Sequence, residues 1–156
     1  NVNDPGVGMA QFKSLEKFKL FTADTGLFIT LAFKDKHFTE NDIYTRILND
    51  KLQTNLGYVY ENMVAQMLVA NGHELYYHTF LNEKSRHNYN INFLISEKNK
   101  ICPIEVKSSG YKNHASIDAF TQKFSSRIAR KILIYTKDYL HEGDMYYLPI
   151  YMTQFL

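Results

Sequence analysis

The sequence predicts one mixed α/β domain, and its length, composition and periodicity all support this fold class. The chain has 156 residues, which is long enough to bury a hydrophobic core within one domain. Its hydrophobic content of 45% and aromatic content of 15% argue against disorder. We expect an irregular lead-in over residues 1–16, a strand and helical subregion over 17–54, and an α/β core over 55–156.

The part before the core is expected to contain one short strand and two helices. Residues 18–21 read as the strand, and a turn at 23–26 leads into an apolar helix over 27–33. Thr39 is a suitable N-cap, with Asp42 three residues later, and predicts a second helix through Leu48. The opening residues read as a loop and lack an initiator methionine, so we expect the chain to be a piece of a longer protein.

The core begins with a predicted helix over residues 55–70, closed by Asn71 and Gly72. Its apolar residues lie on a broad arc with Glu61 in the middle, and we expect the helix to be buried nearly all round. A buried carboxylate must be paired, neutralised or bound to a ligand. Two interpretations stay open: Glu61 makes a local ion pair or hydrogen bond, or it points into a polar pocket.

Three strands follow, over residues 73–80, 89–96 and 101–108, with a tight turn at 98–100. The short connections predict an antiparallel meander. Cys102 lies in the third strand beside a proline and is expected to be a small buried hydrophobic residue.

The rest of the core is predicted as one helix and two strands. Ser116 is expected to cap a helix that buries Ile117 and Phe120. Residues 131–135 form a nearly continuous apolar strand of the kind that is buried on both faces, and 145–148 add a last strand. The predicted order is therefore helix, three-strand meander, helix, strand, strand, in a mixed sheet.

Strand alternation brings polar side chains together on two of these strands. Ile104 and Val106 point to one face, so Glu105 and Lys107 share the other. On the preceding strand, alternation places Asn90, Asn92 and Leu94 opposite Ile91, Phe93 and Ile95. If the two strands are hairpin neighbours, Asn92, Glu105 and Lys107 converge on one point.

Such a group suits metal-dependent hydrolysis of a phosphodiester. Mg²⁺ takes oxygen ligands and binds through one or two carboxylates together with phosphate oxygens. A lysine two residues from a ligand carboxylate shares its strand face, so its ammonium can orient water or screen developing charge. The triplet from Glu105 to Lys107 also occurs on exposed strands as a simple ion pair, and the position that should carry an aspartate holds Asn92.

The charge pattern favours phosphate binding by one segment. Between Lys98 and Lys137 there are nine basic residues and only two acidic ones, although the formal net charge of the chain is +2. The residues we expect to contact nucleic acid are Lys112, Lys123, Arg127 and Arg130. A solvated charged face explains the same pattern equally well.

Other features limit the class of protein. A single cysteine excludes an internal disulfide and a thiolate metal cluster. No apolar run approaches the length needed to cross a membrane and no signal peptide opens the chain, so we expect a cytoplasmic protein without a membrane partner.

These segments carry a family resemblance. Glu61 on the first core helix, the strand containing Asn92, and the run from Ile104 to Ser108 resemble the signature of the restriction-endonuclease-like superfamily, the PD-(D/E)xK nucleases. More narrowly, residues 17–156 resemble the domain of unknown function found C-terminal to a bacterial and archaeal AAA-type ATPase. Residues 19–27, with their Asp-Thr-Gly-Leu run, belong to this similarity.

The resemblance implies a nuclease-like core joined to an N-terminal ATPase module of the same chain. The metal aspartate of the family falls on Asn92, its second acid on Glu105, its lysine on Lys107 and its helical glutamate on Glu61. Mg²⁺ or Mn²⁺ is the implied cofactor of an active enzyme. Asn92 offers only a neutral oxygen, and the nearest acids that can substitute are Glu83 and Glu97.

Three functions follow as alternatives. The first is a catalytically impaired nuclease fold that acts as a DNA-binding or interaction module. The second is an active metal-dependent DNA endonuclease that uses Glu61, Glu105 and Lys107 as catalytic residues, with Glu105 and Asn92 on the metal. The third is a protein-interaction domain that regulates the ATPase, with tyrosine and phenylalanine side chains forming the docking surface.

Overall fold

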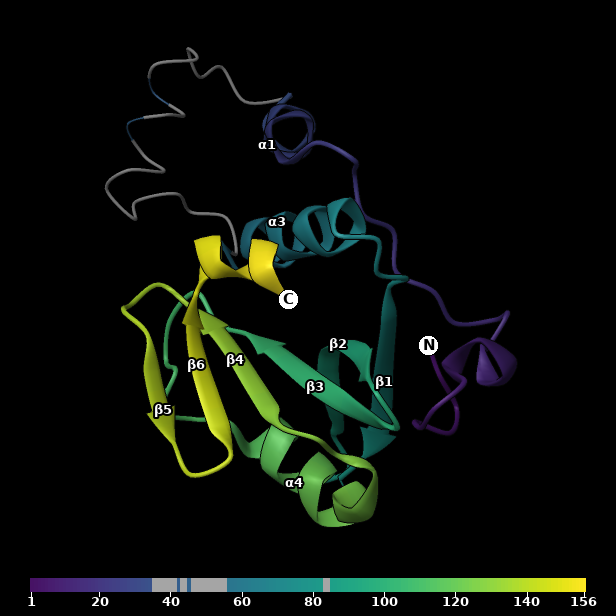
Figure 1. The fold of residues 1–156 in the computed structure, drawn as a ribbon. Helices are drawn as coiled ribbons and strands as arrows, with labels where there is room; N and C mark the ends of the chain where they lie inside the picture. Colours follow the sequence, from purple (N-terminus) through teal and green to yellow (C-terminus); the bar gives the residue numbers. More distant parts are fainter. Residues whose placement is uncertain (35–41, 43–44, 46–55, 83–84) are drawn as a thin grey trace.

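A computed structural model describes residues 1–34, 42, 45, 56–82 and 85–156 (Figure 1). The helix predicted from Thr39 through Leu48 falls almost wholly outside these residues. The elements are η1 Met9–Phe12, α1 Thr25–Ala32, α3 Leu56–Ala70, β1 Tyr76–Leu81, β2 Asn88–Glu97, β3 Lys100–Val106, α4 Ala115–Phe124, η2 Ser125–Arg127, β4 Lys131–Tyr135, β5 Leu140–Glu142, β6 Met145–Pro149 and η3 Ile150–Phe155.

The strands form one six-stranded mixed sheet in the order β1-β2-β3-β4-β6-β5. β1, β2 and β3 are an antiparallel meander, as predicted. β4 lies parallel to β3, and β6 lies parallel to β4. The parallel pairing of β3 and β4 requires a crossover connection, which α4 supplies. The chain is therefore a mixed α/β domain, in which α4 connects β3 to β4, the two parallel strands at the centre of the sheet.

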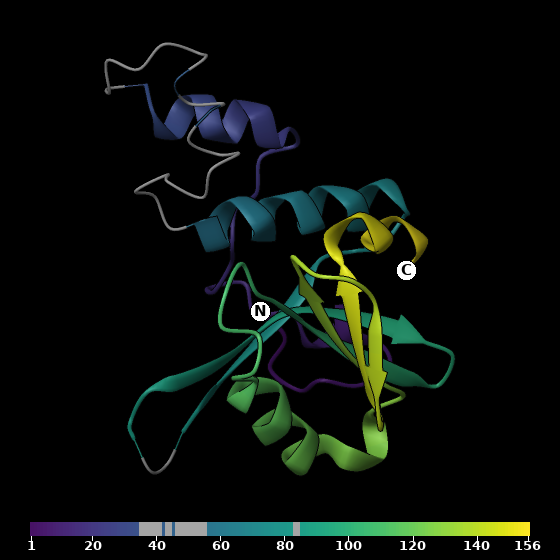
Figure 2. The same cartoon turned by 90° about the vertical axis from the view of Figure 1, so that its left-hand side faces the viewer.

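Helices cover both faces of the sheet. Figures 1 and 2 show α3 and η3 over one face and α4 over the other. On the first face, Val64 and Leu68 of α3 pack with Phe93, Ile104 and Ile132 from three different strands. This double cover explains why β4 is apolar along its length, as the sequence predicted.

The α4 face holds the second apolar cluster. Ile117 and Phe120 of α4 pack there with Leu133 of β4 and with Ile91 and Leu94 of β2. Both helix residues are fully buried, as predicted. The two clusters lie on opposite faces of the sheet and use alternate residues of the central strands.

The predicted alternation along β2 is wrong in one respect. Ile91 was expected to share a face with Phe93 and Ile95, but it packs with Leu94 in the α4 cluster, while Phe93 and Ile95 pack in the α3 cluster. The cause is an irregular register with β1. Tyr76 pairs with Leu94 and His78 with Ile91, so β2 contains one extra residue there, which is a β-bulge.

Several local predictions also need correction. Residues 18–21 are not part of a strand. The N-cap of α4 is His114, and Ser116 lies inside the first turn. The three-residue strand β5 was not predicted, and its residues are all exposed. The helix α3 is not buried all round, because the side chain of Tyr58 is 64% exposed.

The lead-in docks on the edge of the sheet. Val2 is fully buried, and its backbone N–H donates to the carbonyl of Tyr77 in β1 at 2.9 Å. Its own carbonyl oxygen lies 2.7 Å from Nδ1 of the buried His78. The Nε2 atom of His78 is buried and has no hydrogen-bond partner among the described residues. The ring lies against Phe80, Phe120 and Phe124, so a charge there is unfavourable.

We expect His78 to make the domain less stable in mild acid. Burial lowers the pKa of His78 below its usual 6.5, against the smaller opposing effect of the Val2 carbonyl. Below pH 6.5 the unfolded chain binds a proton that the folded chain binds less well, so the free energy of unfolding falls as pH decreases. Urea titrations at pH 7.5 and 5.5 should show a larger loss for the wild type than for His78→Gln.

The exposed His141 supplies the control for this prediction, because His141→Gln should keep the pH dependence of the wild type. Equal losses in the wild type and in His78→Gln would refute the prediction.

No helix among the described residues is long and apolar enough to span a membrane.

Candidate functional site

One side of α3 binds the segment that leads into α1. We call residues 17–25, which end with the first residue of α1, the strap. The amide of Asn62 binds it at several points. Asn62 Oδ1 accepts a hydrogen bond from the backbone N–H of Thr22 at 2.9 Å, and Asn62 Nδ2 donates to Thr22 O and to Thr25 Oγ1. One turn further along the helix, Gln66 Oε1 accepts from both the N–H and the hydroxyl of Thr25. The strap is thus fixed by polar side chains of α3.

Glu61 also faces the strap. Its Oε1 atom lies 2.5 Å from Nζ of Lys19, and the side chains of Glu61 and Lys19 are 13% and 27% exposed. The Lys19 ammonium additionally lies 5.0 Å from the centre of the Tyr77 ring, which is a cation–π contact. The first interpretation of Glu61, a local ion pair, is therefore present in the structure.

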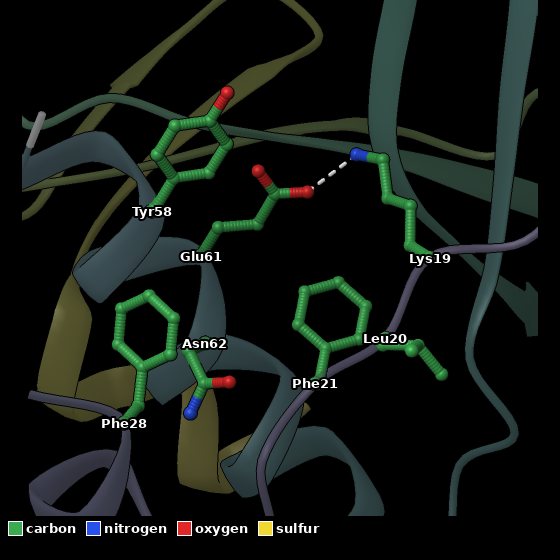
Figure 3. Close-up of a pocket in the computed structure, with 7 residues that line it drawn as sticks. All are labelled: Lys19, Leu20, Phe21, Phe28, Tyr58, Glu61 and Asn62. Carbon is green, nitrogen blue, oxygen red and sulfur yellow. Dashed lines mark hydrogen bonds and ion pairs between the residues drawn. The ribbon is translucent and has the colours of Figure 1, made fainter. Parts of the chain in front are cut away.

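Glu61 and Lys19 line a cavity of about 210 Å³ between α3 and the strap. Figure 3 shows Tyr58 and Phe28 on one side of it and Phe21 on the other, with Glu61 reaching between them toward Lys19. A second cavity, of about 130 Å³, is lined by Lys19 together with Asn92 of β2. Lys19 is therefore shared between the cavity of Glu61 and the cavity of Asn92.

Asn92 lies where β2 and β3 separate. The last pair of the β2–β3 ladder is Phe93 with Ile104. Beyond it, the backbone N–H of Val106 donates to Asn92 Oδ1 at 3.0 Å. The side-chain oxygen thus replaces a strand carbonyl at the end of the ladder, and one of its lone pairs is already used.

Glu105 and Lys107 form an ion pair at the end of β3. Glu105 Oε1 lies 2.8 Å from Lys107 Nζ, and the two side chains are 5% and 29% exposed. The other oxygen, Oε2, is buried and has no hydrogen-bond partner among the described residues. Burial of a carboxylate is costly unless it is paired, so Lys107 is the main compensation for the charge of Glu105.

The structure brings together three of the four residues predicted for catalysis and metal binding. Asn92 contacts the backbone of Val106, which lies between Glu105 and Lys107 in the chain. Glu61 has its ion pair with Lys19 instead. Of the two substitute acids, Glu83 lies outside the described residues, and Glu97 accepts hydrogen bonds from Cys102 and Arg130.

The residues present do not fit a divalent metal ion as they are arranged. Mg²⁺ needs several oxygen ligands in near-octahedral geometry. In the described part of the chain, no three His, Cys, Asp or Glu side chains are grouped so that they can hold a metal. The Asn92 oxygen accepts from Val106, and the acids Glu61 and Glu105 each pair with a lysine.

The four residues predicted to bind nucleic acid have different surroundings. Lys112 is exposed in the loop before α4. Lys123 is exposed on α4, with its ammonium over the rings of Phe80 and Phe124.

The two arginines already have acidic partners. Arg127 forms an ion pair with Asp4 and also donates to the carbonyl of Pro5. Arg130 donates to Glu97 at 2.8 Å.

Two parts of the site were not predicted from the sequence. The first is Lys19, which lies 42 residues before Glu61 and is therefore not linked to it by any sequence spacing. The second is the position of Tyr111 and Lys137 next to the predicted residues Lys107 and Lys112; we call these four residues the basic edge. Lys137 follows β4, and its ammonium lies 4.7 Å from the centre of the Tyr111 ring. Parallel pairing of β3 and β4 brings their carboxyl ends together, which the charge count alone does not reveal.

Comparison with known proteins identifies the family of the chain. The profile of a family described as a domain of unknown function, DUF4143, matches residues 56–153. Comparison with curated proteins and with solved structures found no match. The matched residues include α3, the whole sheet and α4, whereas the strap lies before them. Because the match covers well over half of the sequence, the chain belongs to the DUF4143 family.

Proposed function

We propose that the domain has a restriction-endonuclease-like core that binds DNA and does not cleave it by metal-dependent chemistry. The element order supports the architecture, because a helix, an antiparallel three-strand meander, a crossover helix and a parallel strand follow one another. The resemblance of the Glu105 and Lys107 segment supports it as well. An ATPase module in the same protein is the partner that this proposal implies.

The observation that carries DNA binding is the basic edge. Lys112 and Lys137 are exposed, and Tyr111, which precedes Lys112 in the chain and lies under the Lys137 ammonium, is partly buried. The Tyr111 ring is supported from behind by Tyr135 of β4, at 5.3 Å between ring centres. Exposed lysines attract phosphates, and an aromatic ring offers a surface on which a base can stack. The edge includes Lys107, the residue on which the resemblance places the catalytic lysine of a nuclease.

The contacts of the Glu105 carboxylate and the Asn92 amide support the loss of cleavage. At this point Lys107 pairs with Oε1 of Glu105, so only Oε2 of that carboxylate is left for a metal ion, and the Asn92 oxygen already accepts from Val106. The site therefore lacks the second carboxylate that the family pattern requires at position 92. We therefore assign binding, and not hydrolysis, to this edge.

Binding to a labelled 20-base-pair duplex, measured by fluorescence anisotropy, tests the proposal. Lys112→Gln/Lys137→Gln should weaken binding about tenfold at low salt and reduce the slope of log affinity against log salt by about 2. Lys17→Gln/Lys34→Gln removes the same charge from the exposed N-terminal part and serves as the control. No binding at low salt would refute DNA binding, and Mg²⁺-dependent cleavage that Glu105→Ala abolishes would refute the loss of chemistry.

A protein-interaction module is the second candidate, favoured by exposed apolar side chains. Phe18 and Leu20 of the strap are 70% and 85% exposed, and Leu27 and Leu31 of α1 are also exposed. Large exposed apolar groups are typical of binding surfaces. Co-purification of the domain with its ATPase module after nuclease treatment, lost in Phe18→Ser/Leu20→Ser, would support this candidate.

A further inference from the structure

Lys19 occupies the position in which a cation would bind Glu61. Its ammonium lies 2.5 Å from Glu61 Oε1 and 5.0 Å from the centre of the Tyr77 ring. It also lines both the cavity of Glu61 and the cavity of Asn92. A single positive group therefore lines both the cavity of Glu61, which the resemblance assigns to catalysis, and the cavity of Asn92, which it assigns to the metal.

The strap is anchored on the C-terminal side of Lys19. Asn62 is 2% exposed and binds the backbone of Thr22 through both atoms of its amide. Gln66 Oε1 accepts hydrogen bonds from both the backbone N–H and the hydroxyl of Thr25. These hydrogen bonds fix the chain three and six residues beyond Lys19. The position of the Lys19 ammonium near Glu61 therefore does not depend on the ion pair alone.

We propose that Lys19 is a built-in counter-ion that excludes divalent cations from Glu61. The ammonium neutralises the carboxylate, and a metal ion that approaches the same oxygen meets a like charge at close range. The inference rests on the proposed function in one respect only, because both state that no metal ion binds in this region. It concerns Lys19 and Glu61, whereas the proposed function depends on the basic edge.

Removal of the charge should open Glu61 to small cations. In Lys19→Met the unbranched side chain keeps most of its length but leaves the Glu61 carboxylate without its ammonium partner. Mn²⁺ broadens the NMR signals of nearby amides. We expect millimolar Mn²⁺ to broaden the amide signals of Tyr58, Glu61 and Asn62 at least threefold more in Lys19→Met than in the wild type.

Three further variants make the experiment decisive. Lys19→Met/Glu61→Gln should lose the added broadening, and Lys19→Arg, which keeps the charge, should match the wild type. Lys17→Met removes an exposed positive charge from the same strap and should also match the wild type. Unchanged amide positions away from the strap show that each variant is folded.

Two results would overturn the inference. Equal broadening in the wild type and Lys19→Met would show that Lys19 does not exclude the ion. No broadening in a folded Lys19→Met would show that Glu61 is not a cation site. DNA affinity of the same variants separates this inference from the proposed function, because the basic edge is intact in all of them.

Discussion

Lys107→Met should lower the free energy of unfolding by about 3 kcal/mol at pH 7. Glu105 is nearly fully buried, and its Oε2 atom already lacks a hydrogen-bond partner in the described part of the structure. The variant removes the ammonium 2.8 Å from Oε1, so both oxygens of a buried carboxylate are left without compensation. Urea denaturation followed by circular dichroism measures the loss.

A double variant identifies the cause of this loss. Glu105→Gln/Lys107→Met carries no buried charge, and should recover most of the stability at pH 7. A single variant within 0.5 kcal/mol of the wild type would contradict this account.

Asn62→Ala should cost about 2–3 kcal/mol and loosen the strap. The variant removes the acceptor of the Thr22 N–H and the donors to Thr22 O and Thr25 Oγ1, all on the interface between α3 and the strap. Hydrogen exchange followed by NMR should show faster exchange of the Thr22 amide. The exchange rates of the β3 amides should change only as much as the change in the free energy of global unfolding requires.

Gln122→Ala is the matched control for this change. Gln122 is an exposed amide in the last turn of α4, so its removal should change stability by less than about 0.5 kcal/mol. Unchanged exchange of the Thr22 amide in Asn62→Ala would contradict the anchoring role of Asn62.

The sequence predicted the core elements because their local signals agree with their packing. The meander, the helix α3 ending at Gly72 and the apolar strand β4 all appear where periodicity and turn residues place them. Gly72 has a positive φ of 84°, the conformation expected at such a helix end. The bulge in β2 was not predictable, because an extra residue in one strand is defined only by its partner in another.

The candidate site was predicted less completely for the same reason. Glu105 and Lys107 are two residues apart, so strand alternation was enough to place them side by side, and the predicted hairpin brought Asn92 to the backbone of Val106. Strand alternation could not predict that Lys19 is the ion-pair partner of Glu61. Lys19 lies in a segment that was interpreted as a strand, and its position depends on the hydrogen bonds of Thr22 and Thr25 with α3. An unusually polar face on an otherwise apolar helix, with Asn62 and Gln66 one turn apart, is the signal that points to such a docked segment.

Calorimetric titration of the wild-type chain with Mn²⁺ tests the central claim that the acids at this site no longer hold a metal ion. Glu105→Ala is the control, and both proteins are titrated to millimolar Mn²⁺. The account predicts no saturable heat in the wild type beyond that of the control, because Lys19 and Lys107 already neutralise Glu61 and Glu105. Binding in the micromolar range that disappears in Glu105→Ala would contradict it and would assign metal-dependent chemistry to the domain.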